Sequence, residues 1–326
     1  MNFKRKLLYF LVSFIFIIPI NTLAYSKYLI PGGENIGIKV ESDGVFIVGF
    51  YKVNGEEIAS KSGFKIGDRI IKINDKEIHN VVDLVNNIDK KLDSIEIKFD
   101  VIRNNLVKEI TMTLKKDDDL SYKTGLYVKD SIVGIGTLTY IDPDNNNYGA
   151  LGHEVTDNTG FSFTINSGSI YSSTITSLTK ASNNTPGEKN ASINTKEVYG
   201  NINYNLKTGI YGTLTKEISN EKAIEVMSIN EVKIGKAEII TVLSDNKKEY
   251  FNIEILSIDK ENKTKNFLIK ITDERLLKET GGIVKGMSGS PIIQDGKLVG
   301  AVTHTIVDNP EKGFGISIEK MLESVK

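Results

Sequence analysis

The sequence predicts a mainly β protein, in which a small α/β module is followed by a larger region of β-barrel type. From about residue 125 onward, many short strand-like runs are separated by turns rich in Asn, Gly and Pro, such as "DPDNNN" and "NNTPGEKN". Many short strands over about 200 residues are typical of a closed barrel or a pair of barrels. There are few helical signals in this region before "SIEKMLESV" near the end. At 326 residues the chain has room for both parts.

Residues 1–27 have the composition of an export signal. Lys4, Arg5 and Lys6 precede the apolar run "LLYFLVSFIFIIPI", and small residues follow it. The apolar stretch is also close to the ~20 residues that a helix needs to span a bilayer. A cleaved signal peptide and an uncleaved membrane anchor therefore both remain open. In either case the rest of the chain is expected outside the cytoplasm, because the positive end stays inside.

Residues 28–115 form the predicted α/β module. Its centre reads "GDRIIKINDKEI", followed by a segment with helical spacing, "NVVDLVNNIDK", and an alternating strand, "SIEIKFDVIR". This order resembles a bacterial PDZ domain, and the matching positions are Gly67, Asp68, Ile70, Ile73, Asn74, Ile78, Asp83 and Leu84.

PDZ domains bind peptides by adding a strand to an open sheet edge. The resemblance therefore implies a peptide-binding segment at Ile36, Gly37 and Ile38, within "NIGIKV". Residues 116–124 carry a charge run with few apolar residues and are predicted to be a linker. Residues 125–326 form the second predicted domain.

The composition excludes several kinds of site. The chain has no cysteine, which rules out disulfides, thiolate catalysis and cysteine-based metal sites. Its 41 basic residues nearly balance 42 acidic ones, so no nucleic-acid partner is expected. Only three histidines, His79, His153 and His304, can serve as a base near neutral pH. His79 precedes the predicted helix and is interpreted as a helix-start or surface residue.

One segment has the alternation of a calcium loop, with Asp142, Asp144 and Asn146 at every second position. A calcium loop also needs glycine at its sixth position and a carboxylate at its twelfth. Asn147 and His153 stand there instead, so we interpret the segment as a hairpin turn. Neither a metal nor a cofactor is expected.

The segment "GMSGSP" is the candidate nucleophile turn. Ser288 has Gly286 two residues before it and Gly289 after it, and glycine permits backbone conformations that a side chain would block. In acyl transfer, the N–H groups of the nucleophile and of the residue two earlier can bind the oxyanion, here Ser288 and Gly286. Ser290 competes for the role, but Pro291 follows it, which favours a turn or strand-entry hydroxyl. By itself the motif is weak evidence for a catalytic serine, because an ordinary structural turn has the same residues.

A histidine in the right chain order strengthens this hypothesis. His153 follows a predicted strand in "YGALGHEVTD" and lies far upstream of Ser288, as in chymotrypsin-like enzymes, where His, Asp and Ser follow in that order. A structural role for His153 remains an alternative. His304 lies on the second strand of the predicted hairpin after Ser288, and a packing role is favoured for it.

Spacing alone does not locate the carboxylate that would orient the histidine. Three aspartates lie far downstream of the histidine and before the serine, and two acidic residues follow the histidine closely: Asp245, Asp259, Asp273, Asp157 and Glu154. Any of them could accept a hydrogen bond from the imidazole.

Several long segments resemble the SpoIVB family of sporulation serine peptidases. They are "LIPGGENIGIKV", "YGALGHEVTD", "TPGEK", "ITDERLLKETGGIVKGMSGSPIIQDGKLVGAVTH" and "DNPEKGFGISIEKML". The resemblance covers nearly the whole chain and implies a PDZ domain joined to a chymotrypsin-like double β-barrel. It also implies a catalytic triad of His153, Asp273 and Ser288.

The resemblance further implies a function in sporulation signalling. The peptidase would be exported across the forespore inner membrane and act in the intermembrane space, secreted or membrane-anchored. It would cleave itself and a regulatory membrane protein. Cleavage of the membrane protein would activate a second protease, which matures a late sigma factor. The alternatives are a catalytically inactive PDZ adaptor at the spore membranes and a structural coat or envelope protein. The presence of both His153 and Ser288 argues against these two.

Overall fold

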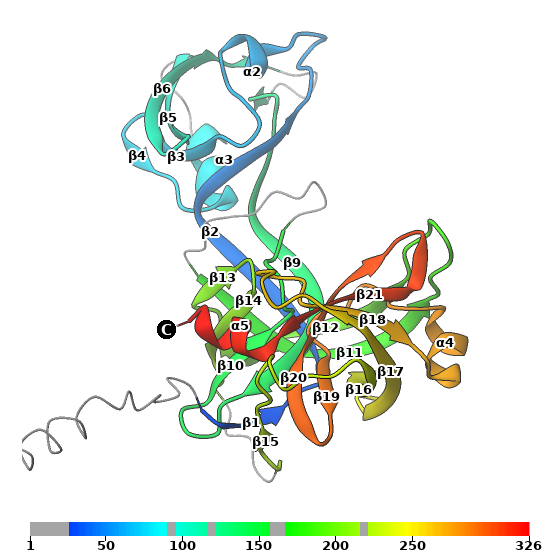
Figure 1. Cartoon of the computed structure of the whole chain (residues 1–326). Coiled ribbons are helices and arrows are strands. Elements are labelled where there is room, and N and C mark those ends of the chain that lie inside the picture. Colours follow the sequence, from blue (N-terminus) through cyan, green and yellow to red (C-terminus); the bar gives the residue numbers. More distant parts are fainter. Residues whose placement is uncertain (1–25, 90–95, 117–120, 157–166, 216–220, 326) are drawn as a thin grey trace, which may run out of the picture.

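The computed structural model describes residues 26–89, 96–116, 121–156, 167–215 and 221–325. It consists mainly of strands, arranged as a small unit and a larger unit joined by two long strands (Figure 1). The mainly β architecture is confirmed. Most of the predicted signal or anchor, residues 1–25, lies outside the described residues. In the described part, no helix has the length and apolar character needed to cross a membrane.

The small unit is a sheet with two short helices. Its strand order is β9–β2–β3–β5–β6. Alternation along β5 buries Ile97, Phe99 and Val101, which share one hydrophobic cluster with Leu84 of α3. The elements confined to this unit are α2 (Ile58–Lys61), β3 (Arg69–Ile73), β4 (Lys76–Glu77), α3 (Val81–Asp89), β5 (Glu96–Arg103) and β6 (Leu106–Thr113).

Two long antiparallel strands connect the units. They are β2 (Asn35–Phe50) and β9 (Leu126–Ile141), which pair from Phe50 with Leu126 to Asn35 with Thr137. In Figure 1 both run from the small unit down into the larger one. A two-stranded ribbon, β7 (Lys115–Lys116) with β8 (Tyr122–Lys123), precedes β9 in the segment predicted to be a linker.

The structure moves the boundary between the units. β1 (Tyr28–Pro31) pairs with the far end of β9 and with β15 (Ile224–Glu225), both in the larger unit. The first half of β2 also belongs there, because residues 36–41 pair with β11 on one side and with β9 on the other. Residues 28–41 therefore lie in the larger unit, whereas the sequence assigned them to the α/β module.

The larger unit begins with a half-barrel sheet. Its order is β13–β14–β10–β9–β2, and β11 and β12 extend it beyond β2. The elements are β10 (Asn147–Ala150), β11 (Ser167–Thr179), β12 (Glu188–Asn201), β13 (Tyr204–Leu206) and β14 (Gly209–Thr213). Apolar side chains of β2, β9, β10 and β11 form its core, including Ile38, Leu138, Ala150 and Ile170.

A closed six-stranded barrel completes the fold, in the order β16–β17–β18–β21–β20–β19. Its elements are β16 (Gly235–Val242), β17 (Lys248–Ile258), β18 (Phe267–Ile271), α4 (Glu274–Thr280), β19 (Pro291–Gln294), β20 (Lys297–Ile306), β21 (Asn309–Ser317) and α5 (Ile318–Glu323). Phe251, Phe267 and Ile269 are fully buried in its core. The larger unit is thus one closed barrel and one half-barrel.

Candidate active site

The turn that carries Ser288 is fixed to strand β9. Thr137 donates from its backbone N–H to the Ser288 carbonyl (2.9 Å) and from its hydroxyl to the Gly286 carbonyl (2.7 Å). Gly289 has φ +96°, and a Cβ there would lie 2.0 Å from the Thr137 carbonyl oxygen. Only glycine fits this approach of the turn to the strand. The serine is therefore held by backbone contacts between the barrel and the half-barrel.

Two N–H groups of this turn are available to a ligand. In the described part of the chain, the backbone N–H groups of Gly286 and Ser288 have no protein acceptor. Those of Met287, Gly289 and Ser290 donate to carbonyls within the protein. A pair of free N–H groups two residues apart beside a nucleophile can bind a developing oxyanion.

The two serines of the turn differ in accessibility. Ser288 lines a cavity, and its Oγ donates to the Thr303 carbonyl at 2.8 Å. Ser290 is fully buried, and its Oγ has no hydrogen-bond partner among the described residues. Only Ser288 is placed to contact a substrate.

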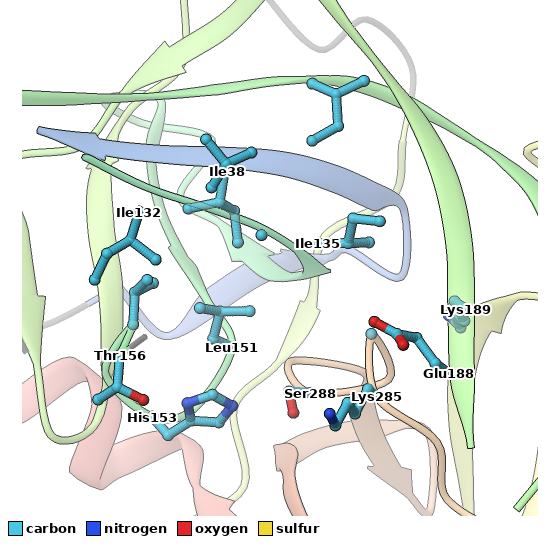
Figure 2. A pocket seen from close by; sticks show the side chains of 15 residues that line it. Ile38, Ile132, Ile135, Leu151, His153, Thr156, Glu188, Lys189, Lys285 and Ser288 are labelled. Carbon is cyan, nitrogen blue, oxygen red and sulfur yellow. The ribbon is translucent and has the colours of Figure 1, made fainter. Parts of the chain in front are cut away.

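His153 lies at the same end of the cavity as Ser288 (Figure 2). Its Nδ1 is 2.8 Å from the Glu154 carbonyl, which can only accept, so Nδ1 carries the proton and Nε2 is left as an acceptor. Burial lowers the pKa of His153 below its ordinary value of 6.5, against the opposing effects of the Glu154 carbonyl and charge. The imidazole is therefore neutral at pH 7 and competent as a base. The Ser288 hydroxyl points to Thr303 in this conformation, not to His153.

His304 packs against His153, with ring centroids 5.0 Å apart and planes inclined by 40°. Burial of part of its ring, and then the charges of His153 and Lys265, lower the pKa of His304 to about 4. His304 is thus a neutral neighbour of His153 whose residue as a whole remains exposed, and the packing role expected from the sequence stays a prediction.

The structure does not bring Asp273 to His153. Asp273 is the N-cap of α4, where its side chain accepts from the backbone N–H of Leu276 (3.0 Å) and of Asn252 (3.3 Å). Asp273 is not among the residues that line the cavity of Ser288. The prediction that it orients the imidazole is not supported in this conformation, because its oxygens satisfy the start of the helix.

The other acidic candidates have different surroundings. Asp259 accepts backbone N–H groups within its own turn, and Asp245 lies in a turn with φ +53°. Asp157 lies outside the described residues. The negative charge of Glu154 acts to raise the pKa of His153. The imidazole ring contacts the backbone carbonyl of Glu154, not its carboxylate.

The cavity has a volume of about 710 Å³. Apolar side chains form about half of its lining, and charged residues lie along the side formed by the start of β12 and the serine turn (Figure 2). The lining residues besides Ser288, His153 and Gly286 include Ile38, Ile132, Ile135, Leu151, Ile193, Glu188, Lys189 and Lys285. A space of this size accommodates several residues of an extended peptide.

Lys189 is a site residue that sequence reasoning missed. It is 1% exposed, and its Nζ donates to the Thr241 hydroxyl at 2.7 Å. Its alkyl stem lies 3.1–3.4 Å from the position that a Cβ on Gly286 would take. Its backbone N–H donates to the Lys285 carbonyl, and the Lys285 N–H to Gly187. The "TPGEK" segment thus packs against the serine turn and forms hydrogen bonds with its backbone. The residue types of the segment did not indicate this contact.

The predicted PDZ peptide site needs a correction. Ile36, Gly37 and Ile38 pair with β9 on one edge and with β11 on the other. They offer no open edge for a peptide, and Ile38 instead lines the catalytic cavity.

The remaining motifs are not part of the cavity. His79 is exposed, and its Nδ1 lies 2.7 Å from Asp43, which raises the pKa of His79. Asp142 receives N–H groups within the "DPDNNN" turn. Among the described residues, no group of three or more His, Asp or Glu side chains could hold a metal ion.

Models of two known families match most of the chain, and the PDZ match includes residues 35–41, which the structure pairs with strands of the larger unit. The family model of the SpoIVB peptidase S55 matches residues 120–322, and that of the PDZ domain matches residues 35–114. A search of curated proteins found no match.

Among solved structures, the Rv3671c protease from M. tuberculosis in its active form is 14% identical, covering 59% of this chain and 72% of that one, with a TM-score of 0.36. The PDZ domain of the SdrC-like protein Lmo2051 from Listeria monocytogenes is 17% identical, covering 27% and 90%, with a TM-score of 0.24. TM-scores this low support no inference about function. The match over residues 120–322 covers more than half of the chain, and the chain therefore belongs to the SpoIVB peptidase S55 family.

Proposed function

We propose that the protein is a serine endopeptidase in which Ser288 is the nucleophile and His153 the base. The observation that carries this proposal is one cavity that holds the Ser288 hydroxyl, a neutral His153 and the free N–H groups of Gly286 and Ser288. Membership of a peptidase family supports the same chemistry.

The mechanism follows from these positions. Rotation of the Ser288 side chain away from Thr303 presents its Oγ to the substrate carbonyl and its proton to Nε2 of His153. The oxyanion that forms accepts hydrogen bonds from the N–H groups of Gly286 and Ser288. The Glu154 carbonyl holds the Nδ1 proton while His153 is positively charged, and His153 then gives its proton to the leaving amine.

Labelling with a fluorophosphonate probe tests this assignment. The wild-type protein should be labelled, and Ser288→Ala should not. Ser290→Ala is the matched control, because its hydroxyl is buried and has no hydrogen-bond partner in the described part of the chain, so its removal should leave labelling intact. An unlabelled wild-type protein would instead favour the inactive PDZ adaptor. Labelling that survives in Ser288→Ala would assign the nucleophile to another residue.

We also propose that the peptidase acts in sporulation signalling, exported into the intermembrane space of the developing spore. Membership of the SpoIVB family and the N-terminal apolar segment support this. The substrate would be a regulatory membrane protein, whose cleavage activates the protease that matures a late sigma factor. Capture with the Ser288→Ala protein, crosslinked in sporulating cells, should recover that substrate. Normal maturation of the sigma factor in a Ser288→Ala strain would refute the pathway assignment.

Self-cleavage is the remaining part of the proposal. It predicts shortened forms in the wild-type protein that are absent from Ser288→Ala, detectable by N-terminal sequencing. Identical patterns in both proteins would assign the cleavage to another peptidase.

A further inference from the structure

Strand β9 has one edge that no described strand covers over most of its length. One edge pairs with β2 from Leu126 to Thr137. On the opposite edge, pairing with described strands begins only at Leu138, with β10. β1 pairs with Tyr140 and Ile141 on the edge that β2 occupies. An unpaired edge presents backbone groups to which an extended chain can add.

The end of this edge nearest Leu138 borders the catalytic cavity. Four consecutive residues, Ile132 to Ile135, line the cavity together with Ser288 and His153. The next contact along β9 is the hydrogen bond from Thr137 to the carbonyl of Ser288. A chain on this edge therefore leads directly to the nucleophile.

The other end lies beside helix α3 of the small unit. Asp130 of β9 accepts the backbone N–H of Val81 at 2.8 Å, which fixes the start of the helix against the strand. Val82 and Val85 of the helix are 66% and 45% exposed, and Tyr127 of the strand is 57% exposed. An uncovered strand beside a helix with exposed apolar side chains is the arrangement in which PDZ domains take up a peptide strand.

We propose that the substrate binds along β9 as one added antiparallel strand, with its scissile bond at the catalytic cavity and its C-terminal side reaching α3. This rests on the proposed peptidase function. β9 runs from α3 toward the cavity, so an antiparallel partner leaves the cavity and runs back toward α3. Antiparallel pairing is also slightly more stable per residue than parallel pairing.

This arrangement selects an extended chain of defined length. Tyr127 and Ile135 are about eight residues apart, or roughly 27 Å at about 3.4 Å per residue. The substrate must therefore continue for about eight to ten residues after the scissile bond, in a segment free of its own secondary structure. The odd-numbered residues Tyr127 and Val133, 57% and 60% exposed, lie on one face of the strand and would contact its side chains.

A length series tests the proposal with the full chain. Quenched-fluorescent peptides, chosen from a random library, would share one scissile bond and carry about four, eight or twelve residues after it. We expect kcat/KM to rise about ten-fold once the peptide can reach α3, mostly through a lower KM. Equal values for all lengths would overturn the docking proposal. Failure to cleave even the short peptide would overturn the peptidase function instead.

N-methylation of the long peptide tests strand addition itself. Only every second amide of an added strand faces its neighbour, so methyl groups after the scissile bond should weaken cleavage at alternate positions. A uniform effect, or none, would contradict pairing with β9.

An exposed side chain on the edge provides the matched test in the protein. Tyr127→Ala should reduce kcat/KM for the long peptide several-fold and leave the short peptide unaffected. Tyr250→Ala is the control, because this tyrosine is 56% exposed on β17, in the closed barrel away from β9. Equal effects of the two substitutions, or loss of short-peptide cleavage in Tyr127→Ala, would refute the proposed contact.

Discussion

At the scale of single residues, Lys189 combines support of the serine turn with a buried charge. Burial lowers the pKa of Lys189 from 10.5 to about 7. Between pH 7 and 10.5 the unfolded chain therefore binds more protons at this residue than the folded one, and stability rises with pH across that window. Below about pH 7 both states carry the proton, and the folded state bears the full cost of the buried charge.

Lys189→Met should accordingly raise the free energy of unfolding by about 1–3 kcal/mol at pH 6, and by less as the pH rises. Methionine keeps the stem that packs on Gly286 and removes only the ammonium group. Lys285→Met, at an exposed neighbour, is the control and should change stability little at either pH. Chemical denaturation at pH 6 and pH 9 checks this, and a gain that grows with pH would contradict the assigned cause.

At the scale of elements, Asp273 is a residue whose carboxylate could either cap helix α4 or orient the catalytic histidine. Asp273→Ala removes the N-cap of α4 and should lower the free energy of unfolding by about 1 kcal/mol, whereas Asp273→Ser, another good capping residue, should restore it. Thermal unfolding of both variants measures this. Equal stability of the two would contradict the capping role.

The activity of the stable Asp273→Ser protein then separates capping from catalysis. Retained fluorophosphonate labelling would match the structure, in which the Glu154 carbonyl holds the imidazole. Loss of labelling in a folded protein would mean that the carboxylate reaches His153 in another conformation, as the family resemblance implies.

Local chemistry made part of the site predictable from the sequence. The glycines around Ser288 and the turn before His153 are short-range features, and the structure places both residues at one cavity. The Asp-Glu-Arg-Leu-Leu run after Thr272 also has the form of a helix start, so the capping role of Asp273 was accessible from the sequence. Lys189 gave no such signal, because its burial depends on strands far along the chain.

At the scale of the whole molecule, the unpredicted feature is that β2 and β9 belong to both units. The alternation of apolar side chains along "NIGIKVESDGVFIVGF" does not depend on which strand lies beside it. The sequence therefore could not show that residues 36–41 pair with strands of the larger unit. The consequence is functional. The edge open to a peptide moves from Ile36–Ile38 to β9, where it becomes continuous with the catalytic cavity.

Strands β2 and β9 also allow the small unit to be deleted without disturbing the larger one. Glu41 pairs with Ser131, so replacing residues 42–130 with Asn-Gly should close a tight hairpin on the larger unit. The core of the half-barrel draws its apolar side chains almost entirely from outside the deleted segment, with Phe46 as the exception. The shortened protein should therefore fold and cleave the short peptide at close to the wild-type rate, and lose the roughly ten-fold advantage of the long peptide. Steady-state kinetics with the short and the long peptide test this prediction, and circular dichroism verifies that the variant is folded. A folded hairpin variant that still prefers the long peptide would show that the small unit does not bind it.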